Sequence, residues 1–261
     1  GSRDIFVHDR QSGQTVRVSI SSLGVQGNGD SSSPYLSADG RYVTFYSVAS
    51  NLVPGDTNEK TDVFVHDRQT GETTRVSVAS DGTQGDDHSL LPCISADGRW
   101  VAFVSFSGNL VLDDTNGNTD VFVHDRQTHE TERVSVTSDG AEIAGTDWSV
   151  ALSADGRYVA FGSADATLLA GTANGQHHVF VHDRDTGETA VVSVADDGAL
   201  GDGWSGITRH SLSANGRYVS FWSMAANLVA GDTNDAMDVF LRDRQIEEER
   251  ALYIPVLLRV P

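Results

Sequence analysis

The dominant feature of the sequence is an internal repeat that runs through nearly all of its 261 residues. The motif Asp-Ile-Phe-Val-His-Asp-Arg at 4–10 recurs with small changes at 62–68, 120–126, 178–184 and 238–244. A second motif, Ser-Ala-Asp-Gly-Arg or Ser-Ala-Asn-Gly-Arg, recurs at 37–41, 95–99, 153–157 and 213–217 with the same spacing of 58 or 60 residues. A period this regular leaves no room for a separate second domain, so we expect one domain built from equivalent units.

Each unit has the pattern of four short strands. Two apolar or β-branched runs flank an Asp-Gly turn, and a Val-Phe-Val run and a Thr-Arg-Val-Ser-Val run flank an Arg-Gln-Thr-Gly turn. In the first complete unit these four strands are expected at 34–37, 42–46, 63–66 and 74–78. No segment shows sustained helical spacing. The sequence therefore predicts an all-β fold of four-stranded antiparallel units, the construction of a radial β-propeller.

The unit resembles the TolB-type propeller repeat. The Ser-x-Asp-Gly turn and the Asp-x-Phe-Val strand carry the resemblance, which extends to about residue 254. It implies a β-propeller of a bacterial exported protein, and hence a periplasmic or extracellular location. The usual proline of the family's turn is alanine here, at Ala38, Ala96, Ala154 and Ala214, a change expected to leave the hairpin intact.

The repeat boundaries predict the number of blades. Residues 1–20 form a half blade, 33–80, 90–138 and 148–195 form complete blades, 209–254 form the last blade, and 255–261 form a closing tail. Five blades are favoured, closed where the two chain ends meet. Four blades, or a fragment of a larger ring, are the alternatives.

The net charge of the chain limits the classes of partner that it can bind. The chain has 18 Lys and Arg against 37 Asp and Glu, a net charge of −19, which disfavours nucleic acid and anionic membranes. The single cysteine, Cys93, cannot form an internal disulfide, and no apolar run is long enough to span a bilayer. The opening Gly-Ser-Arg resembles a cloning remnant, and any signal peptide is expected to have been removed.

Three loops between the second and third strands share an Asp-Thr-Asn-x-x-x-Asp pattern that suits a hard cation such as calcium. The candidate ligands are Asp56, Asn58 and Asp62; Asp114, Asn116 and Asp120; and Asp232, Asn234 and Asp238. The alternative is that these side chains only form turns and cap the strands. In the remaining unit Thr172 and His178 replace both acids together, which indicates that the two acids are partners in one site.

The connections between blades are expected on the same face as these loops, because propeller strands alternate in direction. This face carries the candidate ligand-binding residues Asp30, Asp87, His88, Asp147, Trp148, Asp202 and Trp204. Tryptophan beside carboxylate is typical of sites for sugars or cationic peptides. Each tryptophan could instead fold back over the core. His8, His66, His124 and His182 also recur, but at a position too near the blade rim to converge on one metal, so we expect a structural role.

These features favour a non-enzymatic binding or scaffold propeller that docks a protein or glycan on its long-loop face, with calcium as a possible stabiliser. No catalytic motif appears, and no catalytic residue is assigned. The alternatives are a hydrolase or lyase with its site at the central channel, and a structural spacer of an exported protein. An enzyme would need blade-specific groups at that channel; His88, Asp147, Asp202, Arg209 and His210 are the candidates. A monomer is favoured.

Overall fold

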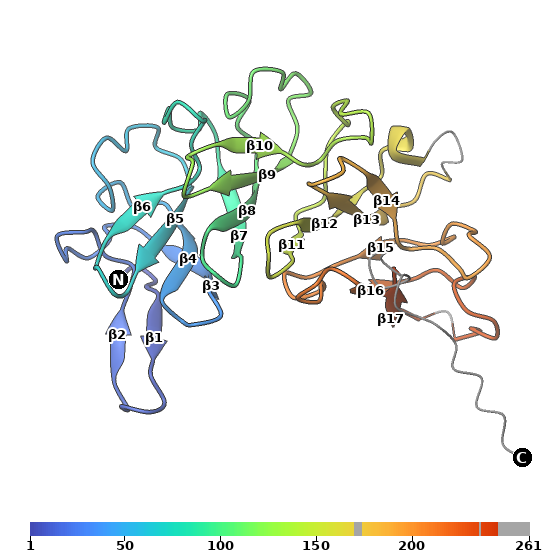
Figure 1. Cartoon of the computed structure of the whole chain (residues 1–261), viewed down its shortest axis with the longest axis horizontal. Helices are drawn as coiled ribbons and strands as arrows, with labels where there is room; N and C mark the ends of the chain where they lie inside the picture. The colour runs from blue at the N-terminus through green and yellow to red at the C-terminus, as the bar shows by residue number, and fades with distance from the viewer. Residues whose placement is uncertain (170–173, 235, 245–261) are drawn as a thin grey trace, which may run out of the picture.

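The structure is a computed structural model that describes residues 1–169, 174–234 and 236–244. This part of the chain is all-β apart from one short 3-10 helix, η1 (Ala166–Leu169). Its antiparallel sheets follow one another around an arc, with the first hairpin at one end and the last sheet at the other (Figure 1). The prediction of an all-β fold with four-stranded antiparallel units is confirmed.

The strand bounds define five sheets. The N-terminal hairpin holds β1 (Phe6–His8) and β2 (Thr15–Arg17). Sheet one holds β3 (Ser31–Leu36), β4 (Tyr42–Ser47), β5 (Asp62–Asp67) and β6 (Thr73–Arg75), and sheet two holds β7 (Ser89–Ile94), β8 (Trp100–Ser105), β9 (Asp120–Asp125) and β10 (Thr131–Arg133). Sheet three holds β11 (Val150–Leu152), β12 (Tyr158–Ser163), β13 (His178–Asp183) and β14 (Thr189–Val191), and sheet four holds β15 (Ser205–Gly206), β16 (Tyr218–Ser223) and β17 (Asp238–Asp243).

The hydrophobic core lies between neighbouring sheets. Successive side chains of a strand point to opposite faces, so the third strand of each unit serves two interfaces. In β5, Val63 and Val65 pack against Phe103 and Phe122 of sheet two, whereas Phe64 packs toward the N-terminal hairpin. All five side chains are buried. The Val-Phe-Val run therefore holds each sheet between its two neighbours.

The predicted turn forms in sheets one to four, as Asp-Gly in the first three and as Asn-Gly in sheet four. Gly40 has a φ of 68°, a left-handed conformation that glycine adopts without strain. The next residue, Arg41, binds both carboxylate oxygens of Asp67 at 2.9 and 2.7 Å. Arg68 donates from Nη1 to the Gly40 carbonyl oxygen at 2.6 Å. The two tight turns of a unit therefore lie on the same face of the molecule and are joined by charge-assisted hydrogen bonds.

The alanines of these turns also join one sheet to the next. The N–H of Ala38 donates to the Ala96 carbonyl at 3.0 Å, that of Ala96 to Ala154 at 2.8 Å, and that of Ala154 to Ala214 at 2.9 Å. A proline at these positions has no N–H to donate. The hairpin is kept, as expected, and the departure from the family's proline also supplies a hydrogen bond between sheets.

The fourth strands are shorter than the sequence suggested, because a serine hydroxyl takes the place of a backbone hydrogen bond between the third and fourth strands. β6 ends at Arg75, and the Ser77 hydroxyl then accepts from the Val63 N–H at 3.1 Å and donates to Asp62 at 2.6 Å. Residues 245–254 and the tail 255–261 lie outside the described residues, so the number of blades stays a prediction. No described helix has the length and apolar character needed to cross a membrane.

Candidate metal centre and long-loop face

Loops of neighbouring units meet on one face of the molecule. Lys60, in the loop between β4 and β5, pairs with Asp87 of the next between-sheet connection at 3.0 Å. The Thr61 N–H donates to Nδ1 of His88 at 3.0 Å. The two kinds of long connection therefore share a face, which we call the long-loop face.

The first Asp-Thr-Asn loop is built around Arg75, whose largely covered side chain the spacing of the loop did not predict. Nη1 of Arg75, on β6, lies 3.4 Å from Asp56 and 3.3 Å from Asp62. Asn58 turns its amide nitrogen to Asp62 at 3.1 Å and to the Gly85 carbonyl at 2.9 Å. The asparagine therefore positions the aspartate, and a guanidinium supplies the positive charge.

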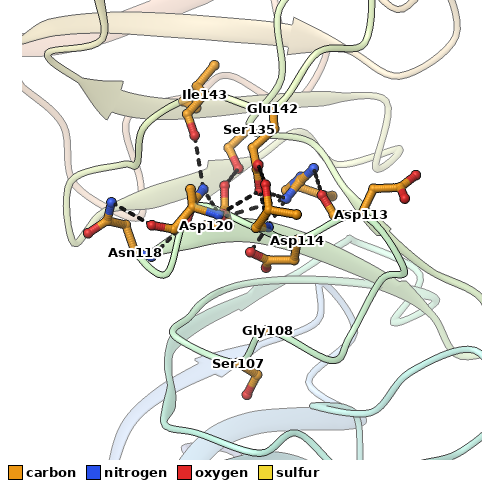
Figure 2. Close-up of polar contacts among 12 residues, drawn as sticks. Ser107, Gly108, Asp113, Asp114, Asn118, Asp120, Ser135, Glu142 and Ile143 are labelled. Atoms are coloured by element: carbon orange, nitrogen blue, oxygen red, sulfur yellow. Dashed lines mark hydrogen bonds and ion pairs between the residues drawn. The ribbon is translucent and has the colours of Figure 1, made fainter.

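The second loop carries more negative charge. Asp114, Asp120 and Glu142 place one carboxylate oxygen each within 4.8 Å of one another, and Figure 2 shows them converging from separate segments. Nη1 of Arg133 lies 2.5 Å from Glu142, 3.7 Å from Asp114 and 4.0 Å from Asp120. Three carboxyl groups thus surround one guanidinium, and this acidic cluster is the described group best suited to hold a metal ion.

The surplus of negative charge changes the protonation of the acidic cluster. Burial, followed by the nearby Asp120 carboxylate, raises the pKa of Asp114 to about 6. Although burial also raises the pKa of Glu142, hydrogen bonds from Thr115 and the charge of Arg133 lower it to about 2. Nε of Arg133 is buried without a hydrogen-bond partner among the described residues. A cation beside these carboxylates would lower the pKa of Asp114 and so stabilise its charged form.

Asn116 is occupied in the same way as Asn58. Its Nδ2 donates to Asp120 at 2.7 Å and to the Ile143 carbonyl at 2.9 Å, while its Oδ1 accepts from the Asn118 N–H at 2.6 Å. In the last of the three loops, Asn234 donates to Asp238 at 3.2 Å, and Asp232 has no cationic partner among the described residues. The structure brings the carboxylates together in the first two loops and uses the asparagine of each of the three loops as a hydrogen-bond donor.

The unit that lacks both acids also lacks the arginine. Val191 stands where Arg17, Arg75 and Arg133 stand elsewhere, and position 172 lies outside the described residues. His178 replaces the second aspartate and bonds to Ser193 at 3.1 Å and to Asn174 at 2.9 Å. In this unit the two acids and the arginine are absent together, in agreement with the ion pairs that join them in the first two loops. The absence of both acids and of the arginine from one unit is the sequence pattern that could have identified Arg133 as a partner of the acids.

Four of the predicted ligand-binding residues already have partners on other segments of the chain. Hydrogen bonds from Arg3 lower the pKa of Asp30, and Asp202 accepts from the Ala226 N–H at 2.9 Å. Asp87 and His88 bind Lys60 and the Thr61 N–H, as described above. These side chains organise the long-loop face, and a ligand would have to compete with their present partners.

The other three predicted residues belong to one patch. Trp148 is 62% exposed and lies edge-on to Phe106, with ring centroids 5.5 Å apart. Trp204 is 47% exposed and lies edge-on to Trp222 at 5.5 Å. His177 packs beside Trp204 at 5.2 Å and bonds to Asp147 at 2.8 Å. We call these six residues, Phe106, Asp147, Trp148, His177, Trp204 and Trp222, the tryptophan patch.

Two small residues make room for the patch. A Cβ at Gly162 would overlap the Asp147 carboxylate, and a Cβ at Gly206 would overlap the Trp222 ring. Gly162 stands where the other units have Tyr46, Val104 and Trp222. This exchange, together with His177, was the signal in the sequence that these residues form a site.

The central candidates Arg209 and His210 join sheet four to sheet one. Arg209 donates from Nη1 to the Ser33 carbonyl at 2.9 Å, and His210 stacks on Tyr35 with centroids 4.9 Å apart. Cys93 is buried nearby, and burial raises the pKa of its thiol to about 12. The neutral thiol is unsuited to nucleophilic attack, and the structure gives the arginine and histidine a packing role.

Comparison with known proteins shows the fold. No protein-family model matches the sequence, and no curated protein matches it. TolB from Acinetobacter baumannii aligns over 93% of this chain with a TM-score of 0.51 and 16% identity. The chain folds as a β-propeller. It spans 47% of that TolB chain, about half its length.

An oligogalacturonate lyase in complex with manganese aligns over 93% of this chain and 57% of its own, with a TM-score of 0.49 and 14% identity. Hydrazine synthase from Kuenenia stuttgartiensis aligns over 92% of this chain and 56% of its own, with a TM-score of 0.41 and 14% identity. At these identities the likenesses concern the fold alone.

Proposed function

We propose that this propeller is a non-enzymatic binding module of an exported protein that docks a protein or glycan on the tryptophan patch. The exposed rings of Trp148 and Trp204, on a highly charged surface, are the observation that carries the proposal. Large apolar rings on a soluble surface usually mark an interaction site. Each ring is held by an edge-on contact with a neighbouring aromatic ring. The two side chains therefore lose little conformational entropy when a ligand covers their exposed surface.

The chemistry of the patch favours a ligand with both apolar and polar groups. The tryptophan rings offer flat surfaces for a sugar ring or an aliphatic side chain. Between them, Asp147 and His177 form a hydrogen-bonded pair that can accept from hydroxyl or ammonium groups. The net charge of −19 favours neutral or cationic ligands over anionic ones.

Binding to arrays of glycans and of basic peptides tests the proposal. Trp148→Ala and Trp204→Ala should each weaken binding of a captured ligand by about 2 kcal/mol or more, as expected for a hot-spot side chain. Leu112→Ala is the matched control, because Leu112 is fully exposed on a loop of the same face but lies outside the patch. An equal loss of binding in the control, or full binding by the Trp148→Ala/Trp204→Ala double variant, would show that the tryptophan patch is not the binding surface.

We further propose that the acidic cluster holds a divalent cation such as calcium. Its three carboxylates are hard oxygen ligands. The raised pKa of Asp114 also supports the proposal, because a cation beside this carboxyl group would favour its charged form. The Arg133 guanidinium lies among the same oxygens, so it must shift when a cation binds. The loop of Asp56 and Asp62 has Gln84 in place of Glu142 and is expected to bind less tightly.

Calcium titration of the melting temperature tests the cation site. At a hundredfold excess over Kd, one site stabilises the fold by about 2.7 kcal/mol. We expect this gain in the wild-type chain, its loss in Glu142→Gln, and a second gain in Gln84→Glu, which copies the acidic set into sheet one. A calcium response that survives Glu142→Gln would place the ion elsewhere.

A further inference from the structure

Three residues that occur only in the third unit meet at the tryptophan patch. Nδ1 of His177 lies 2.8 Å from Oδ1 of Asp147, and the Asp147 carboxylate occupies the space that a Cβ at Gly162 would need. In sheets one, two and four the matching positions hold serine for Asp147, threonine or methionine for His177, and tyrosine, valine or tryptophan for Gly162. The carboxylate is therefore a feature of this unit and not of the repeat.

A neutral group is sufficient for the fold at the position of Asp147. The other sheets have a buried serine there that bonds to a serine of the second strand, in the pairs Ser31–Ser47, Ser89–Ser105 and Ser205–Ser223. The Asp147 side chain is 23% exposed, and a carboxylate that is largely covered is costly unless it is paired. Among the described residues it pairs with no lysine or arginine. A positively charged ligand would supply the missing partner.

One oxygen of the Asp147 carboxylate is available to such a ligand. A carboxylate only accepts hydrogen bonds, so Nδ1 of His177 donates to Oδ1. The other oxygen, Oδ2, accepts no hydrogen bond from a described residue. His177 therefore fixes the orientation of the carboxylate and leaves a single acceptor atom for a ligand.

Exposed indole rings accompany this acceptor. Trp148 follows Asp147 directly in the sequence, and Trp204 packs beside His177 with ring centroids 5.2 Å apart. Both tryptophans are exposed. The face of a tryptophan ring attracts cations more strongly than the face of any other aromatic side chain. Indole rings with a carboxylate acceptor have the chemistry of an ammonium-binding site.

The long connections of sheets three and four carry only negative charge. The four segments 136–150, 163–178, 192–206 and 223–238 together hold ten Asp and Glu residues and no Lys or Arg. A surface with charge of one sign attracts ligands of the opposite sign and raises their rate of association. The charge around the patch therefore favours a cationic ligand.

We propose that the tryptophan patch binds a lysine side chain of a partner protein, with the aliphatic stem against Trp148 and Trp204 and the ammonium group on Oδ2 of Asp147. This inference rests on the proposed function, because it names the ligand of the same patch. Arginine is disfavoured, since its planar fork binds both oxygens of a carboxylate and His177 already occupies one of them. A sugar is disfavoured because its hydroxyl groups need a set of placed polar groups, and the patch has only Asp147 and His177 besides its indoles.

NMR titration of the chain with three blocked single residues tests the inference. The first probe is Nα-acetyl-lysine methylamide, the second is its arginine counterpart, and the third is the Nζ-acetylated lysine form, which keeps the stem and lacks the charge. The lysine probe should shift the indole signals of Trp148 and Trp204 with a Kd in the millimolar range, as expected for so small a ligand. The arginine probe should bind about fivefold more weakly and the acetylated probe about tenfold more weakly.

Variants of the chain test the role of each polar group. Asp147→Asn keeps the size of the side chain and removes its charge, so it should weaken binding of the lysine probe about tenfold. An unchanged Trp100 signal shows that this variant keeps the fold. Asp86→Asn is the matched control, because Asp86 is exposed on the same face outside the patch and the variant loses the same charge. His177→Ala frees the second oxygen of Asp147, so the arginine probe should gain affinity relative to the lysine probe.

Three results of the titration would overturn the inference: an acetylated probe that binds as tightly as the lysine probe, equal losses in Asp147→Asn and Asp86→Asn, or indole signals of Trp148 and Trp204 that stay in place up to about 50 mM lysine probe. A glycan from the arrays that binds wild type and Asp147→Asn equally would also overturn it, although the patch would remain a binding surface. The proposed function itself fails only if no array ligand depends on Trp148 or Trp204, so the two failures are distinguishable.

Discussion

Single buried arginines balance the acids of the long-loop face. Arg75 and Arg133 each lie among carboxylates that would otherwise be buried without a counter-charge. Removal of one partner of such a set leaves an uncompensated buried charge, which costs more than the pair contributes. The unit with Val191 shows that the fold also accepts a set without the arginine and the two aspartates.

Arg133→Val tests this balance. It should lower the free energy of unfolding by about 3–5 kcal/mol at pH 8. The pKa of Asp114 is already raised to about 6, above the 3.8 of an ordinary aspartate, so protonation relieves the cluster at lower pH. The loss should therefore be small near pH 4 and should grow as pH rises through about 6.

A matched quadruple variant separates charge from packing. Arg133→Val combined with Asp114→Thr, Asp120→His and Glu142→Leu copies the residues of the third unit, Thr172, His178, Val191 and Leu200, and should recover most of the lost stability in urea unfolding. A quadruple variant as unstable as Arg133→Val alone would show that packing of the arginine, rather than charge, dominates.

The turns that begin the second strands act as connectors between sheets. The Ala96 N–H donates to the Ala154 carbonyl at 2.8 Å, a bond between two separate sheets. A hydrogen bond of this kind contributes about 1 kcal/mol, and an unpaired partner adds to the loss. This role distinguishes the alanine from the proline that the family resemblance suggested.

Ala96→Pro should lower the free energy of unfolding by about 1–3 kcal/mol, since proline removes the donor and leaves the Ala154 carbonyl unpaired. Ala214→Pro is the control: Ala214 is an acceptor in the same turn, and its N–H makes no hydrogen bond to a described residue. Chemical denaturation of the two variants gives the comparison. Equal losses would assign the effect to the proline ring instead of the hydrogen bond.

The recurring histidines of the third strands bond to threonines that join one unit to the one before it. The Thr131 hydroxyl donates to the Val78 carbonyl of sheet one at 2.6 Å, so its oxygen accepts from Nδ1 of His124 at 2.9 Å. Burial, followed by the nearby His129, lowers the pKa of His124 to about 4. The same contact at Thr73 and His66 has a histidine whose pKa burial also lowers.

These histidines predict acid sensitivity. Between pH 6.5 and 4 the unfolded chain binds a proton at His124 that the folded chain does not, so the free energy of unfolding falls as pH falls through this window. The loss is at most about 3 kcal/mol for His124. His124→Asn keeps a donor near Nδ1 but does not titrate, so it should flatten the stability curve from pH 6.5 to 4. An unchanged slope would contradict a buried neutral ring.

At the scale of the whole molecule, the repeat predicted the all-β fold, the turns and the common face of the long connections, because these depend on local patterns. The charge partners were missed because Arg133 and Glu142 come from other strands and loops than Asp114, and spacing in one loop cannot show them. His177 was missed for the same reason, since it lies 30 residues from Asp147.

The four tryptophans of the chain allow a direct test of the proposed binding surface, because each indole N–H gives its own NMR signal. Trp148, Trp204 and Trp222 belong to the tryptophan patch, whereas Trp100 lies between Arg99 and Arg184 at the opposite, tight-turn face. On titration with a glycan or basic peptide selected from the arrays, we expect the signals of Trp148 and Trp204 to shift with the bound fraction while that of Trp100 stays in place. A bound ligand that shifts Trp100 and leaves Trp148 and Trp204 unchanged would contradict the account.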